Sequence, residues 1–173
     1  AVEAARAAGC RILLGVSGQA TVLRAGAAGA APLAQALADS GYDGLYLDIA
    51  QQEQMDCARL AQLAQAVRSL IGSDRLLYAA ADAPVSGKAD PDYTALGTAV
   101  DRIVLRVPAF TDTATAVPVS APEPLESICY ALGILNDQVP AGKLSLLLTA
   151  SGQVRKGGRR FSTVDTDSLN TLI

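Results

Sequence analysis

A chain of 173 residues, half of them apolar, is long enough for one domain and short for two. Its 14 basic and 17 acidic residues give a net charge of −3, which argues against a nucleic-acid partner, and no apolar run reaches the 18 residues that a membrane span needs. His is absent, which excludes serine triads of the usual kind, Cys–His dyads and His-based zinc sites.

The chain alternates apolar runs with segments of helical periodicity. Five runs are nearly continuously apolar and bounded by polar or turn residues, a pattern typical of strands that are covered on both faces. These predicted strands are residues 11–16, 44–49, 75–80, 102–107 and 143–148. The segments between them carry apolar residues at helical spacing, with Gly41 and Gly72 where helices should end. The predicted helices are residues 31–40, 58–71, 93–100 and 122–135, after an amphipathic segment at residues 1–10.

Successive predicted strands begin 27 to 41 residues apart, which suits strand–helix–strand units. Such alternation predicts an α/β fold with a parallel sheet and right-handed crossovers. Two architectures satisfy it: an open doubly wound sheet, or part of a (β/α)8 barrel. The loop after the first strand, GVSGQA at residues 15–20, has no G-x-G-x-x-G or Walker pattern, so we expect no nucleotide cofactor.

The three Cys residues are odd in number and too far apart for metal-ligand spacing. We therefore expect buried thiols that act as small apolar side chains, with no disulfide framework, no metal and no other cofactor. These residues are Cys10, Cys57 and Cys129.

The C-terminal part departs from the strand–helix alternation. Residues 154–161, VRKGGRRF, predict a hairpin with Gly157 and Gly158 in its turn. Four cations flank that turn; a solvated hairpin is the favoured interpretation, and an anionic partner is the alternative. A helix is predicted over residues 165–173, where the pattern stops part-way. Since the chain also begins with Ala rather than Met, we expect it to be part of a longer chain.

The sequence DGLYLDIA at residues 43–50 resembles the D-G-x-D-x-D-x-E signature of family 18 glycoside hydrolases, the chitinases and their relatives. In that family the signature forms the fourth strand of the barrel. Segments on both sides resemble the third, fifth, sixth and seventh barrel strands in the same order. They are residues 11–18, 76–85, 93–107 and 132–148, the last containing VPAGK at residues 139–143, which resembles the lead into the seventh strand. The resemblance covers residues 1–150 and implies one domain over residues 1–173, a partial or reduced (β/α)8 barrel of about five strands.

The departures from the signature concern its chemistry. The resemblance implies that the final Glu protonates the leaving glycosidic oxygen, and that position holds Ala50. The position of the middle Asp holds Tyr46, whose phenol has an ordinary pKa of about 10 and supplies no negative charge at neutral pH. General acid catalysis contributes about 10² to 10⁴ in rate. We therefore expect the domain not to act as an enzyme.

Several polar and aromatic residues are expected at the C-terminal ends of the strands, where barrel enzymes place their chemistry. Asp48 is expected to be hydrogen-bonded to Tyr46, Arg106 or a backbone amide. The alternative is an active glycosidase that uses a relocated carboxylate, such as Asp48, alone or paired with Asp82, or Glu53. The candidate ligand-binding residues are Asp43, Tyr46, Asp48, Gln51, Asp82, Arg106 and Phe110.

The favoured function is therefore a catalytically inactive glycosidase-like domain with a structural or weak carbohydrate-binding role. The resemblance alone implies a bacterial-type protein that is secreted or in the cell envelope. The missing barrel strands would come from other segments of a longer chain or from a second copy of this chain. An unrelated open-sheet binding protein is the third hypothesis, and the order of the strands decides it.

Overall fold

The structure is a computed structural model that describes residues 2–51, 56–84, 90–106, 124–147, 151–156 and 160–165. Its centre is a parallel sheet of five strands. The strands are β1 (Leu13–Gly18), β2 (Gly44–Ile49), β3 (Leu76–Asp82), β4 (Arg102–Arg106) and β5 (Leu144–Leu147). All five predicted strands are confirmed; β2 has the predicted bounds, and the ends of the others shift by at most two residues.

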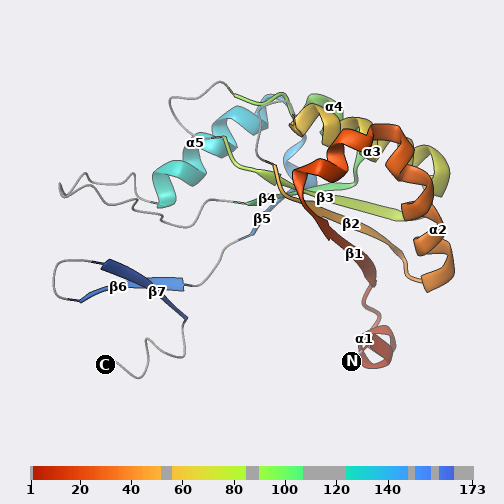
Figure 1. Cartoon of the computed structure of the whole chain (residues 1–173), viewed down its shortest axis with the longest axis horizontal. Coiled ribbons are helices and arrows are strands. Elements are labelled where there is room, and N and C mark those ends of the chain that lie inside the picture. Colours follow the sequence, from red (N-terminus) through yellow and green to blue (C-terminus); the bar gives the residue numbers. More distant parts are fainter. Residues whose placement is uncertain are drawn as a thin grey trace.

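The strands lie side by side in the order in which they occur in the chain, β1-β2-β3-β4-β5, and every pair is parallel. The main helices cover one face of the sheet, and the described part of the chain places no helix against the other face (Figure 1). A doubly wound sheet would reverse its strand order and place helices on both faces. The arrangement is therefore that of a partial (β/α)8 barrel. The helices are α1 (Val2–Ala7), α2 (Ala30–Ser40), α3 (Asp56–Ile71), α4 (Thr94–Ala99) and α5 (Pro124–Asn136).

The two faces of the sheet differ in burial. Side chains alternate along a strand, so every second residue of β2 points toward the helices. Leu45, Leu47 and Ile49 are 0% exposed there and pack in the same core as the helical residues. Gly44 is buried as well, but Tyr46 and Asp48 on the opposite face are only half-buried. The expectation that the strands are covered on both faces is wrong for the described part of the chain, because helices lie on one face only.

The predicted helix ends are confirmed at two glycines. Gly41 follows α2 with φ +65° and Gly72 follows α3 with φ +74°, left-handed conformations that favour glycine. Between β1 and α2 lies a run of 3₁₀ turns, Ala20–Gly29, which the sequence did not predict. Six of its ten residues are Ala or Gly, which give little signal for a helix, and Gly26 breaks it with φ +52°.

The cysteines are only partly as expected. Cys57 is buried at the start of α3, and burial, together with the nearby Asp92, raises the pKa of its thiol to about 12. Cys10 and Cys129 are exposed, so their predicted burial is wrong. Cys10 lies in the connection before β1, and Cys129 lies on the outer side of α5.

A second, antiparallel sheet follows the main one. It is the predicted hairpin, formed by β6 (Ser151–Lys156) and β7 (Arg160–Asp165). Asp165 ends β7, and the other residues of the helix predicted over residues 165–173 lie outside the described residues. Among the helices that the structure describes, none combines the length and the apolar character that a membrane crossing needs.

Candidate ligand-binding site

The guanidinium of Arg106 joins the carboxyl ends of three neighbouring strands. Its Nη1 donates to Asp48 Oδ1 at 2.6 Å and its Nε donates to Asp82 Oδ1 at 2.8 Å. A third bond runs from Nη2 to the backbone carbonyl of Ile49 at 3.1 Å. The three charged side chains come from β2, β3 and β4 and project from the helix-free face. Ionic hydrogen bonds are about twice as strong as neutral ones, so this cluster fixes the edge of the sheet.

The register of the sheet explains how Arg106 reaches both carboxylates. Asp82 is its direct partner on β3, about 4.8 Å away across the ladder. Asp48 lies one strand further, and both Asp48 and Asp82 have the strand parity of the open face. The side chain of Arg106 is long enough to extend across β3, so its guanidinium contacts both Asp82 and Asp48. Arg106 was one of the three partners that the sequence analysis offered for Asp48.

Asp82 is held through its backbone as well as through its carboxylate. The side-chain amide of Gln51 donates to the carbonyl of Ala80 at 3.1 Å and accepts from the N–H of Asp82 at 3.4 Å. The phenol of Tyr93, which is fully buried, donates to the carbonyl of Asp82 at 2.6 Å. Burial raises the pKa of Tyr93, so the phenol keeps its proton for this bond. The end of β3 is thereby fixed from both sides.

Two tyrosines form the middle of the open face. Tyr46 of β2 and Tyr78 of β3 are register partners and are both half-buried. The guanidinium of Arg102 lies 5.8 Å from the ring centre of Tyr78 and donates to the hydroxyl of Ser145 at 2.9 Å. Burial, and then the carboxylate of Asp48, raise the pKa of Tyr46, so its phenol is neutral at physiological pH. Tyr78 lies on the open face and not between the sheet and the helices, because its strand parity is that of Asp82.

Asp43 lies at the opposite end of β2 from the other candidates. Its Oδ2 accepts from the backbone N–H of Ile12 at 2.7 Å, and its Oδ1 is 3.3 Å from Nη1 of Arg11. The five residue steps from Asp43 to Asp48 correspond to about 16 Å along a parallel strand. Its predicted place at the C-terminal strand ends is therefore wrong: the acid ties the start of β2 to the start of β1.

The hydrogen bond between Asp43 and Ile12 should contribute to the stability of the chain, and this contribution should be lost in acid. The hydrogen bond from Ile12, with a smaller effect of Arg11, lowers the pKa of Asp43. The ionised group therefore stabilises the fold above its unfolded pKa of about 3.9, and this contribution is lost as the pH falls through the lower folded pKa. We expect the urea midpoint to fall less between about pH 6 and about pH 3 in Asp43→Asn than in the native chain. An equal fall in both proteins contradicts this, and Asp74→Asn at an exposed position is the control.

The position of the signature's final Glu holds an apolar residue, and two further candidates lie outside the described residues. Ala50 directly follows β2, and its N–H donates to the carbonyl of Gly18 at 2.9 Å. Its methyl group brings no proton donor to this end of the sheet. Glu53 and Phe110 fall in segments that the structure does not describe. Within the described ranges, no three Asp, Glu, Cys or His side chains gather as a metal site would require.

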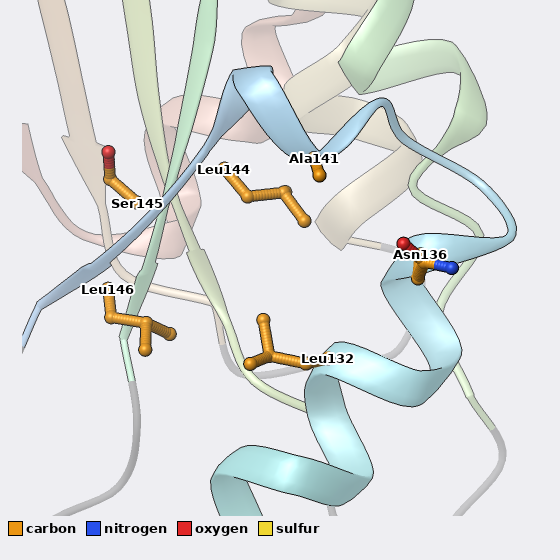
Figure 2. Close-up of a pocket in the computed structure, with 6 residues that line it drawn as sticks. All are labelled: Leu132, Asn136, Ala141, Leu144, Ser145 and Leu146. Atoms are coloured by element: carbon orange, nitrogen blue, oxygen red, sulfur yellow. The ribbon is translucent and has the colours of Figure 1, made fainter.

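A separate cleft of about 350 Å³ lies on the other face of the sheet, between α5 and β5 (Figure 2). Leu144 and Leu146 line it from β5, and their register partners on β4, Ile103 and Leu105, face the helical core. The cleft therefore opens on the helical side, opposite Arg106 and its two acids. Its lining is Leu132, Asn136, Ala141, Leu144, Ser145 and Leu146.

Comparison with known structures assigns the fold to the chitinase-like barrels, as the sequence resemblance implied. A Bacillus subtilis protein named as a sporulation-specific glycosylase superimposes with a TM-score of 0.75 at 15% identity, over 99% of this chain and 63% of its own. A chitinase from Chromobacterium violaceum gives 0.70 at 20% identity, over 99% and 59%. The chitinase domain of a Clostridium difficile spore coat protein gives 0.69 at 15%, over 98% and 56%.

The chain thus spans 56% to 63% of the length of these three structures, while nearly all of it is matched. At such identities the likeness shows the fold alone. No family model and no curated protein matches the sequence.

Proposed function

We propose that the chain is a glycosidase-like domain without hydrolytic activity that has a structural or weak carbohydrate-binding role. The observation that carries the proposal is the engagement of both strand-end carboxylates by one cation. Asp48 and Asp82 each accept a short hydrogen bond from the guanidinium of Arg106. The similar structures named as chitinases and a glycosylase supply the carbohydrate context.

Glycosidic cleavage needs a group that delivers a proton to the leaving oxygen. An aspartic acid does this where its surroundings favour the protonated form, such as an apolar pocket or a second, unpaired carboxylate. In this chain both strand-end carboxylates are engaged as hydrogen-bond acceptors by Arg106. The positions that the family signature gives to its middle Asp and final Glu hold the neutral phenol of Tyr46 and the methyl group of Ala50.

The open face nevertheless offers features that sugars use. Tyr46 and Tyr78 lie on neighbouring strands as a half-buried aromatic pair, against which the apolar face of a sugar ring can pack. The Asp48–Arg106–Asp82 cluster adds hydrogen-bonding groups for hydroxyls next to them. Both acids are near 40% exposed, so a ligand would reach them from solvent.

Incubation with chromogenic chitooligosaccharides tests the loss of hydrolysis. We expect no turnover above the buffer rate, because Ala50 stands at the position that the family signature gives to the proton-donating Glu. Turnover that is abolished by Asp48→Asn or by Glu53→Gln would overturn the proposal in favour of an active glycosidase with a relocated carboxylate.

The weak binding itself is measured in the same preparation by NMR titration with chitotetraose. We expect an affinity near the millimolar range. Tyr78→Ala should weaken it about three- to tenfold, from the roughly 0.5 to 1.5 kcal/mol that an aromatic contact contributes. Tyr130→Ala on α5 is the matched control, since Tyr130 bonds to Asp90 away from the open face. If Tyr78→Ala and Tyr130→Ala bind chitotetraose with equal affinity, carbohydrate binding at the open face is contradicted and only the structural role remains.

The wider setting of the domain is part of the same proposal. Residues 1–173 would form one unit that is completed by other segments of a longer chain, in a secreted or envelope protein of bacterial type. The five-stranded sheet and the 56% to 63% coverage of the similar structures support this, since a closed barrel has eight strands.

A further inference from the structure

Arg102, the first residue of β4, has only neutral partners within the described part of the chain. Its Nη1 donates to the hydroxyl of Ser145 at 2.9 Å, and its guanidinium lies 5.8 Å from the ring centre of Tyr78. Arg102 is half-buried, so its charge has lost part of its contact with water. The other half-buried basic residues that the structure describes bind a carboxylate or backbone carbonyls; they are Arg59, Arg68, Arg106 and Lys143.

The acids nearest to Arg102 are bound by other groups. Asp101 precedes it in the chain, but its Oδ2 accepts from Arg68 at 2.6 Å and from the backbone N–H of Leu77 at 2.8 Å. Both acids of the strand-end cluster accept from Arg106, which lies four residues further along β4, or about 13 Å. No carboxylate of the described residues therefore balances the charge of Arg102.

The unused hydrogen-bond donors of Arg102 are accessible to a ligand. A guanidinium has five N–H donors, and the hydrogen bond to Ser145 uses one of them. No buried side-chain nitrogen or oxygen among the described residues lacks a partner, so the Nε and Nη2 atoms of Arg102 are in contact with solvent. These two atoms form one edge of the planar guanidinium. Such an edge can bind both oxygens of a carboxylate at once.

Arg102 also lies in one row with the two tyrosines of the open face. Tyr46 pairs with Tyr78, and Tyr78 pairs with Arg102, so three neighbouring strands carry these side chains on the same face. On β1 the row ends at Gly15, where a Cβ atom would meet no other atom within 4 Å. The row is therefore an aromatic surface with free space at one end and an unbalanced cation at the other.

We propose that this row binds a small sugar that carries a carboxylate, with the tyrosine pair against a sugar ring and Arg102 on the carboxylate. The inference rests on the proposed carbohydrate-binding role and specifies the class of sugar. It adds Arg102 to the ligand-binding residues, since the strand-end cluster already balances the charge of Arg106.

The net charge of −3 favours a small acidic ligand over a polyanion. At physiological ionic strength, charges more than about 8 Å apart are largely screened. A ligand with one negative charge therefore interacts mainly with the guanidinium that it contacts. A long polyanion would also lie against the acidic residues of the surrounding surface, which excludes polymers with a charge on every unit from the proposal.

NMR titration of the intact chain with cellobiouronate and with its methyl ester tests the inference, because the two disaccharides differ by one negative charge. We expect the acid to bind about tenfold more tightly than the ester, as a charge-assisted hydrogen-bonded pair would give. Arg102→Gln should bind the two ligands with equal affinity. Equal affinities of the native chain for the acid and the ester, or no binding of the acid, would overturn the inference without any variant.

The matched control is Arg75→Gln, which makes the same change in net charge at an exposed position before β3, where Arg75 donates to the carbonyl of Tyr42. It should keep the preference for the acid, and thermal melts verify that both variants are folded. A preference that is lost equally in both variants would overturn the role of Arg102. The proposed function is decided separately by neutral chitotetraose, because a chain that binds the acid and the ester equally still binds carbohydrate.

Discussion

Replacing Gly44 by Ala should lower the free energy of unfolding by about 3 kcal/mol, near the upper end of the cost of overpacking. A Cβ atom at Gly44 would collide with the backbone carbonyl of Leu76, its register partner on β3. A backbone carbonyl in a parallel ladder cannot rotate away as a side chain can. Relief therefore requires β2 and β3 to separate at their first residues. Urea unfolding followed by far-UV circular dichroism measures the loss.

Gly15→Ala is the matched control for this variant. Gly15 lies on β1, on the same open face, and a Cβ there meets no atom within 4 Å. Exchanging glycine for alanine in a strand reduces the entropy of the unfolded chain, so a gain of up to about 1 kcal/mol is expected. If both variants lose stability equally, the close approach of Gly44 to β3 is not the cause.

Arg106→Met should cost about 2 kcal/mol, because it leaves two neighbouring carboxylates and the carbonyl of Ile49 without their common donor. Larger values hold for fully buried pairs, but Asp48 and Asp82 are 39% and 45% exposed and regain water. The loss is read from urea unfolding at neutral pH.

Arg102→Met provides the comparison on the same strand and face. Arg102 contacts the ring of Tyr78 and the hydroxyl of Ser145, which are both neutral, so its loss should cost about 1 kcal/mol or less. In the background D48N/D82N the cost of Arg106→Met should fall to about half, since neutral amides are weaker acceptors. A cost that is the same in both backgrounds would assign the effect of Arg106 to packing alone.

The fold was readable from sequence because each strand of the main sheet is a short apolar run and because α2 and α3 each end at a glycine. The parity of β2 separates Leu45, Leu47 and Ile49 from Tyr46 and Asp48, but the strand count alone could not show that one face stays open. The run of 3₁₀ turns at Ala20–Gly29 was missed because small residues leave no periodic signal. Its position was set by packing rather than by local propensity.

The site was predicted unevenly. Arg106, Asp48 and Asp82 come together because three strand ends meet, which strand parity indicates. Asp43 was misplaced since it stands before the strand, where an acid caps backbone N–H groups instead of facing a ligand. Gln51 and Tyr93 hold Asp82 through hydrogen bonds to its backbone, and no sequence pattern marks such contacts. Tyr78 could have been found from the parity that it shares with Asp82.

The consecutive order of the strands has a consequence for how the sheet is assembled during folding. Gly15 meets Tyr46, and Tyr46 meets Tyr78; across the whole sheet, paired residues are 24 to 41 positions apart. Each pairing must close a loop that contains a helix, which makes formation of a parallel sheet slow, but none has to wait for a segment beyond the next strand. Nucleation can start at any adjacent pair of strands and spread outward one strand–helix unit at a time, as in repeat proteins.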